Sequence, residues 1–256
     1  MKRVDSVISL IYSMSKAEKK AFSVQMLKDK EEKDYLVIYD IITKSKQLDS
    51  KNVKGEFHKR RPGGSFEVSI QYLYERLTDS LLTLRKKKDI YYDLLNNLCK
   101  ARMLYERSLF EECFEILSDT IEQATYYENN EVLTIALKLE LEYLLRLNFP
   151  NLAESELYHK HFMQNEALKK TRKIVEQSSL HNLLKYRLSH IGSIRTSKQK
   201  QDMNDLMVNE LSIAASSGIE GNFELMRNHR LFQANYLMGA GEYKAALNSY
   251  KELSRL

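Results

Sequence analysis

Apolar residues recur along most of this 256-residue chain at intervals of three and four, the spacing of one face of an α-helix. Short stripes predict helices near residues 4–14, 15–27, 35–42 and 50–57. The longest stripe covers about five turns and comprises Phe66, Ile70, Leu73, Leu77, Leu81 and Leu84. We therefore predict an all-α fold.

From Asp89 onward the apolar stripes come in pairs joined by short polar turns, which predicts antiparallel helical hairpins. The predicted pairs are residues 90–105 with 110–124, and 223–238 with 242–253. Between them, residues 132–147 are apolar on most sides, as expected of a helix packed between neighbours. Residues 152–191 predict one long helix or two kinked ones, and residues 202–216 predict another.

Composition supports this interpretation and narrows the class of protein. The chain has only 8 Gly and 2 Pro, too few to form the turns that a strand-rich fold needs. No apolar run approaches the roughly 18 residues of a membrane span, so we predict no membrane association. Two cysteines, Cys99 and Cys113, do not make a disulfide framework, which favours a reducing compartment and hence the cytoplasm.

Charge is distributed in blocks along the chain. Residues 1–88 hold 20 Lys and Arg against 12 Asp and Glu, residues 89–156 hold 5 against 14, and residues 157–256 hold 15 against 9. Such asymmetry indicates either contact between the blocks or separate charged binding surfaces. We predict a basic, all-helical N-terminal segment over residues 1–88, followed by helical hairpins over residues 89–256.

The last predicted hairpin carries small and aromatic residues at characteristic places: Ala234, Gly241, Tyr243, Ala246 and Tyr250. A looser copy of the same spacing comprises Ala101, Ser108, Phe110, Cys113 and Leu117. These hairpins resemble the tetratricopeptide repeat, in which small residues let two helices approach closely. The units here are closer to about 40 residues than to the roughly 34 of that family, and the chain lacks its tryptophan.

The resemblance implies stacked antiparallel hairpins in a right-handed α-solenoid. It further implies a non-enzymatic scaffold that binds a peptide or a partner helix on the inner surface of the repeat. The side chains expected to line that surface flank the two crossing alanines: Arg102, Tyr105, Asn228 and Asn235.

The segment from His58 to Ser65 predicts a basic loop, because Pro62, Gly63 and Gly64 interrupt the helical pattern. Ser65 is placed to cap the long helix that follows. A helix N-terminus attracts anions, so Lys59, Arg60, Arg61 and Ser65 are candidates for anion or nucleic-acid contact. This gives an alternative function, a regulator that contacts nucleic acid through its basic N-terminal segment while the repeat region senses a peptide or partner. An ordinary solvated loop is the other interpretation of the segment.

The sequence shows no constellation typical of an enzyme. Phosphate-binding and nucleophile motifs are absent, and we predict no enzymatic activity, cofactor or metal. His159 and His161 are two residues apart and point to opposite sides of a helix, so they cannot share a metal ion. The acidic residues Glu111, Glu112 and Glu115 fit a solvated helix face.

The chain ends directly after the second helix of the last hairpin, at Leu256. Solenoid ends need a capping helix to cover their final apolar face. We therefore expect either that the native chain continues or that this end pairs with a second copy, giving a homo-oligomer.

Overall fold

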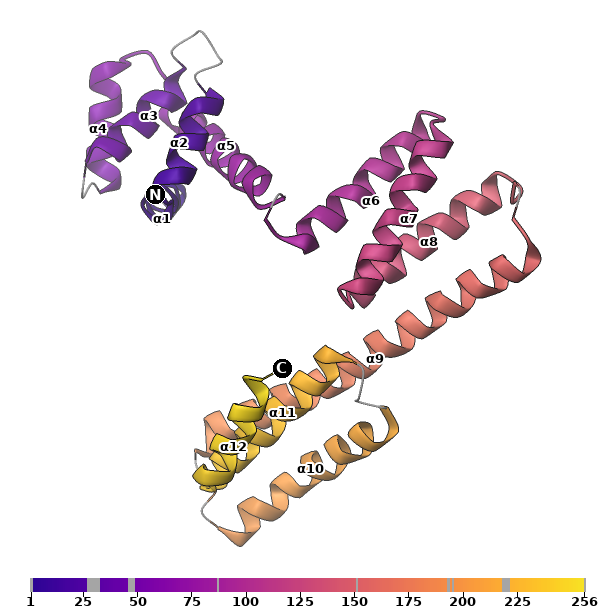
Figure 1. The fold of residues 1–256 in the computed structure, drawn as a ribbon. Helices are drawn as coiled ribbons and strands as arrows, with labels where there is room; N and C mark the ends of the chain where they lie inside the picture. The colour runs from indigo at the N-terminus through magenta and orange to yellow at the C-terminus, as the bar shows by residue number, and fades with distance from the viewer. Residues whose placement is uncertain are drawn as a thin grey trace. The chain divides into compact units, whose positions relative to one another are not determined.

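The computed structural model describes residues 2–26, 33–45, 49–86, 88–150, 152–192, 194, 196–217 and 222–255. Helices hold 86% of these residues and none of them lies in a β-strand, which confirms the all-α prediction. The helices (Figure 1) are α1 Lys2–Ser13, α2 Lys16–Met26, α3 Asp34–Lys44, α4 Ser50–Arg60, α5 Phe66–Lys86, α6 Ile90–Glu106, α7 Phe110–Tyr126, α8 Asn130–Arg146, α9 Glu154–Ile191, α10 Ser197–Ser217, α11 Phe223–Gly239 and α12 Tyr243–Leu253.

The helices pack into two compact units, residues 1–93 and residues 94–256. The division falls near the start of α6, a few residues after the predicted boundary between residues 88 and 89. Among the described helices, none combines the length and the apolar character that a membrane span requires.

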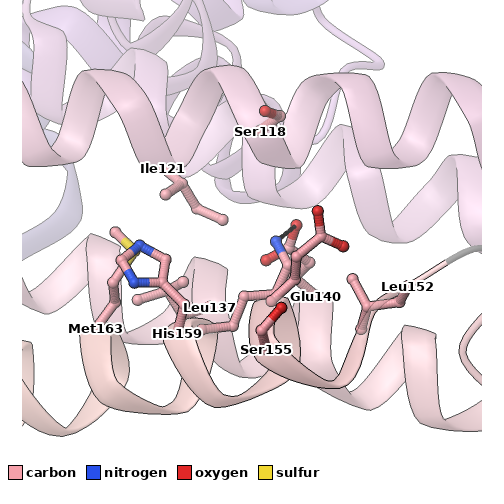
Figure 2. A pocket seen from close by; sticks show the side chains of 10 residues that line it. Ser118, Ile121, Leu137, Glu140, Leu152, Ser155, His159 and Met163 are labelled. Atoms are coloured by element: carbon pink, nitrogen blue, oxygen red, sulfur yellow. Dashed lines mark hydrogen bonds and ion pairs between the residues drawn. The ribbon is translucent and has the colours of Figure 1, made fainter.

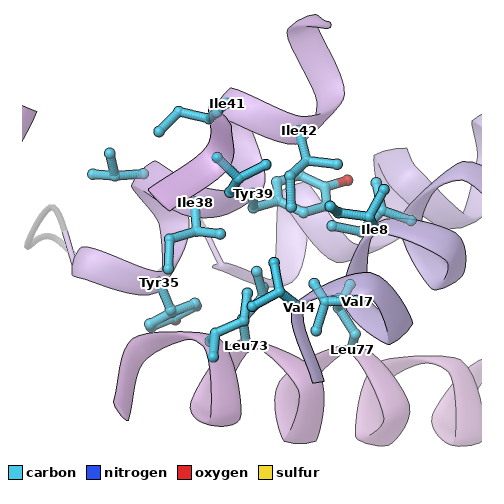
Figure 3. Close-up of a cluster of buried hydrophobic side chains, with 14 of the residues drawn as sticks. Val4, Val7, Ile8, Tyr35, Ile38, Tyr39, Ile41, Ile42, Leu73 and Leu77 are labelled. Atoms are coloured by element: carbon cyan, nitrogen blue, oxygen red, sulfur yellow. The ribbon is translucent and has the colours of Figure 1, made fainter. Parts of the chain in front are cut away.

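The first unit, residues 1–93, is built around the apolar faces of α1, α3 and α5 (Figure 3). The α3 helix packs against α4 and α5, and α1 and α2 also contact α5. Fully buried members of this core include Val7, Ile11, Ile38, Ile42, Leu73 and Leu77. The apolar stripe predicted over residues 66–84 therefore faces this core. Its first four members, Phe66, Ile70, Leu73 and Leu77, are buried.

The predicted boundary of the basic loop was wrong by three residues. The α4 helix continues to Arg60, and the backbone N–H of Arg61 donates to the carbonyl of Phe57 at 2.8 Å. Lys59 and Arg60 therefore lie in the last helical turn rather than in a loop. Gly64 then passes close to the ring of Phe57, where a Cβ atom would be 2.8 Å from Cζ, so glycine is required by close approach.

In the second unit, residues 94–256, α7 packs against α8, α8 against α9, α9 against both α10 and α11, and α11 against α12. The α9 helix is continuous over 38 residues, which decides between the two alternatives left open by the sequence. The first part of α9 packs against α8, and the later part packs against α10 and α11 (Figure 1). The right-handed superhelix remains a prediction.

Three successive turns of the second unit repeat at intervals of 20 residues. In each, the second residue after the helix has a positive φ: 61° at Ser108, 53° at Glu128 and 58° at Asn148. The next backbone N–H then donates to a carbonyl five residues earlier, at 3.0, 2.8 and 2.8 Å. This is the Schellman arrangement that ends helices in the left-handed region. The turn before α12 repeats it with Gly241, where φ is 83°.

Four of the small residues on which the resemblance rests are buried in the second unit. Ala101, Cys113 and Ala234 are completely buried and Ala246 is 3% exposed.

At the end of the chain, α12 leaves Tyr243 and Leu247 exposed. Pairing of this end with a second copy stays a prediction, as does a cytoplasmic location.

Candidate functional site

A groove of about 500 Å³ lies between α7 and α9, with α8 at its base (Figure 2). Its apolar lining comprises Ile121 of α7, Leu137 of α8, Met163 of α9, and Leu152 from the connection between α8 and α9. Leu137 is almost completely buried, because α8 packs between its two neighbours. The groove therefore offers an apolar surface whose position depends on the packing of three helices.

Glu140 of α8 and Lys160 of α9 form an ion pair in the groove. Nζ of Lys160 donates to Oε1 of Glu140 at 2.8 Å, and Glu140 is only 6% exposed. The other carboxylate oxygen, Oε2, is buried and has no hydrogen-bond partner among the described residues. A buried carboxylate oxygen without a donor is costly, so this position can accept a hydrogen bond or a cation from a ligand.

The α9 side of the groove continues onto exposed aromatic surface. Ser155, His159 and Phe162 are spaced by four and three residues and therefore share one face of α9. Phe162 is 61% exposed, and its neighbour Tyr158 is 69% exposed. Exposed aromatic side chains beside an apolar groove are typical of surfaces that bind another protein.

Two of the residues predicted to line a binding surface, Arg102 and Tyr105, lie on α6. Arg102 is exposed and pairs with Glu106 one turn along the helix, at 3.2 Å. Tyr105 is half-buried, because its ring stacks on that of Tyr143 with centroids 3.8 Å apart and also contacts Phe110. Tyr105 therefore packs α6 against α7 and α8.

The other two predicted residues, Asn228 and Asn235 of α11, are 6% and 7% exposed. Asn228 Nδ2 donates to the hydroxyl of Ser178 at 3.3 Å. Asn235 Nδ2 donates to Nε2 of His181 at 3.1 Å, and its oxygen accepts from the hydroxyl of Tyr250 at 3.3 Å. Both asparagines thus join α11 to α9 in the interior, and the structure does not bring the four predicted residues to one surface.

The basic residues predicted to contact an anion or nucleic acid are paired with acidic neighbours. Lys59 contacts Glu56 at 2.7 Å, Arg60 contacts Asp40 at 3.1 Å, and Arg61 lies 3.6 Å from Asp34. Ser65 is exposed immediately before α5. The pairs of Arg60 and Arg61 join α4 and its C-cap to α3, whereas that of Lys59 lies within α4. Together they leave less positive charge for a ligand than the sequence suggests.

A second buried polar cluster joins α9, α10 and α11. Glu210 is completely buried, accepts from Gln177 Nε2 at 3.3 Å, and lies 2.6 Å from Nδ1 of His229. The bidentate ion pair between Arg187 and Asp205 adds a contact nearer the surface, at 2.8 and 3.0 Å. Hydrogen bonding to that guanidinium lowers the pKa of the Asp205 carboxyl. These contacts attach α10 to its neighbours.

The described residues contain no group of three or more His, Cys, Asp or Glu side chains that could hold a metal ion. Both cysteines are free thiols, with Cys99 exposed and Cys113 buried. Burial raises the pKa of the Cys113 thiol, which favours the unreactive protonated form. Cys113 therefore acts as a small packing residue between helices.

Comparison of the chain with protein-family models, with curated proteins and with solved structures gave no match. The geometry of the groove is accordingly the basis for assigning a function.

The pair formed by Glu140 and Lys160 was not predicted from the sequence. A signal was present, because Glu140 stands between Leu139 and Leu141 in a helix that is apolar on most sides. A charged residue at such a position needs a partner. Its partner could not be identified, since Lys160 lies 20 residues later, on another helix.

Proposed function

We propose that residues 94–256 form a protein-interaction module that binds a helical segment of another protein in the groove between α7 and α9. The observation that carries this proposal is the apolar lining of Ile121, Leu137, Leu152 and Met163, continued by the exposed aromatic residues of α9. The proposal places the binding surface on α7, α8 and α9 rather than at the four residues suggested by the tetratricopeptide resemblance.

A helical partner suits a groove bounded by helices. An amphipathic helix presents apolar anchors at intervals of three, four and seven residues and can lay them into a hydrophobic groove. Here three helices would surround the anchors, and a few buried apolar anchors usually supply most of the binding energy. The partner would extend the side-by-side packing of α7, α8 and α9 by one more helix.

The polar residues of the groove support binding rather than nucleophilic chemistry. Ser155 and His159 are four residues apart on α9, but no hydrogen bond joins them among the described residues. A nucleophilic serine would need a base within hydrogen-bond reach. Glu156 accepts from the backbone N–H of Ala153 at 3.1 Å and so helps to begin α9.

Selection of displayed random peptides of about 16 residues, long enough for four helical turns, tests the proposal. The full chain is the target, and selected peptides are measured by fluorescence anisotropy. The groove variant Ile121→Gln/Met163→Gln removes two apolar anchors without adding charge. The matched control, Val208→Gln/Leu211→Gln, changes two exposed residues of α10.

We expect selected peptides to bind the groove variant about tenfold more weakly, a loss of about 1.4 kcal/mol. The control variant should keep the wild-type affinity, and circular dichroism should show unchanged helix content in both variants. Failure to enrich any peptide would overturn the proposal, as would peptides that bind all three proteins equally.

A further inference from the structure

Along its whole length, α7 contains five acidic residues and no Lys or Arg. Glu115, Ser118 and Glu122 are spaced by three and four residues and share one helical face, and Glu111 lies seven residues before Ser118. Ser118 lines the groove, so these three glutamates lie beside it on the exposed face of α7, and we call them the acidic rim. All three are exposed.

The carboxylates of the acidic rim have no ion-pair partner among the residues that the structure describes. Glutamates on the neighbouring helices differ: Glu106, Glu142 and Glu166 each pair with a basic residue within one turn. The helix dipole favours Glu111 in the first turn of α7, but Glu115 and Glu122 lie beyond that turn. Like charges at this spacing destabilise a helix slightly, so the stability of α7 does not account for them.

Glu140 gives a second, independent indication inside the groove. Lys160 satisfies one of its carboxylate oxygens, and the buried oxygen Oε2 has no donor. A partner that brings an N–H group to this point would satisfy that oxygen. An ammonium or guanidinium group would form the stronger, charge-assisted hydrogen bond.

From these observations we infer that the segment taken by the groove is basic: an amphipathic helix of a partner protein with an apolar face and flanking Lys or Arg side chains. The apolar face contacts the groove lining, and the basic side chains face the acidic rim and Glu140. This inference rests on the proposed function and specifies the partner's chemistry.

The charge of the surrounding chain favours the same partner. Residues 89–156, which include α7, α8 and the start of α9, hold 14 acidic residues against 5 basic ones. A surface of one sign attracts an oppositely charged segment over a distance of about 10 Å at moderate salt and speeds association. A basic helix would therefore be attracted before the apolar contacts form.

The composition of the selected peptides is the first test. Peptides enriched on the wild-type chain should carry more Lys and Arg than the unselected library, with a clear net positive charge. Their affinity should fall about tenfold between about 50 and 300 mM NaCl, because salt screens exposed charges.

The variant Glu111→Gln/Glu115→Gln/Glu122→Gln provides the second test. It should weaken binding of these peptides about tenfold and remove most of the salt dependence. The matched control, Glu176→Gln/Glu242→Gln/Glu252→Gln, removes the same charge from the same unit at positions that do not line the groove, and it should leave the affinity unchanged.

The outcomes separate the two proposals. Neutral or acidic peptides that still depend on Ile121 and Met163 would overturn the basic partner and leave the groove function in place. Equal weakening by both triple variants would overturn the acidic rim as the recognition element. If no peptide depends on Ile121 and Met163, both proposals fail. A dimer of the full chain that dissociates on Ile121→Gln/Met163→Gln would assign the groove to a second copy and overturn the basic partner.

Discussion

Single polar residues inside residues 94–256 hold helices together through hydrogen bonds between distant parts of the chain. Asn235 of α11 accepts from Tyr250 of α12 and donates to His181 of α9. Because an amide nitrogen can only donate, Nε2 of His181 must be the acceptor and the ring must be neutral. Burial, with a smaller contribution from Lys185, lowers the pKa of His181 below its usual value of 6.5.

The neutral state of His181 predicts how stability responds to pH. Above about pH 6.5 the ring is neutral in both states, so it adds no pH dependence. As the pH falls below that value, the unfolded chain binds a proton that the folded chain resists, and the free energy of unfolding decreases. The slope from one such group is at most about 1.4 kcal/mol per pH unit.

Urea denaturation at pH 7.5 and 5.5 measures this effect. The loss of stability on acidification should be smaller in His181→Gln than in the wild type. His161→Gln, at an exposed position of α9, serves as the control and should keep the wild-type loss. An equal loss in all three proteins would show that His181 does not titrate as proposed.

Asn228 and Asn235 are seven residues apart in the sequence and so share a face of their helix. The sequence did not indicate that α9 covers this face. Their partners, Ser178 and His181, lie 50 and 54 residues earlier in the chain. Burial by residues so far away in the sequence depends on how the helices pack against one another. The spacing of residues along one helix does not predict that packing.

Helix positions follow from local sequence, and the helix ends depend on the turns between them. The predicted helices from residue 90 to residue 147 agree with α6, α7 and α8 within about two residues, the usual uncertainty of helix ends. The repeated turn every 20 residues is visible only in the structure, because Ser108, Glu128 and Asn148 are different residue types that adopt the same left-handed backbone conformation.

The turn between α6 and α7 offers a test at the scale of one element. Ser108 has a φ of 61°, a conformation that costs a residue with a Cβ atom roughly 1–2 kcal/mol. Ser108→Gly should therefore stabilise this hairpin by about 1 kcal/mol, after the greater flexibility of glycine in the unfolded chain is subtracted.

Hydrogen exchange of the α6 and α7 amides measures the local free energy of opening. Exchange should become slower in Ser108→Gly. The neighbouring residue, Arg107, does not have a positive φ, so Arg107→Gly should speed exchange. Slower exchange in both variants would contradict the role assigned to the backbone conformation of Ser108.

The whole chain divides into two units, each with its own buried core. The core of the first unit draws all its members from residues 4–77, spanning α1 to α5. A separate cluster in the second unit joins α9, α10 and α11 around Leu184, Met203 and Phe232. A group of helices that has its own hydrophobic core can fold independently of the rest of the chain.

We therefore expect the isolated fragment of residues 1–93 to fold. Circular dichroism should show a helical protein with one cooperative thermal transition. Ile38→Ala should destabilise the fragment by about 2–5 kcal/mol, because Ile38 is completely buried. Val68→Ala, at a position that is 68% exposed, should change its stability by less than about 0.5 kcal/mol. An unfolded fragment would contradict the independence of this core.

The amino-acid sequence by itself determined that the protein is helical and approximately where its helices lie. Apolar spacing and the scarcity of glycine and proline act on neighbouring residues, so these properties can be predicted from local patterns. The tertiary structure alone decided which polar residues are buried, that α9 is continuous, and that α7, α8 and α9 enclose a groove. Contacts between helices join residues far apart in the chain, such as Glu140 with Lys160, 20 positions apart, and Gln177 with Glu210, 33 positions apart. Such contacts arise from the packing of whole helices, which local periodicity does not specify.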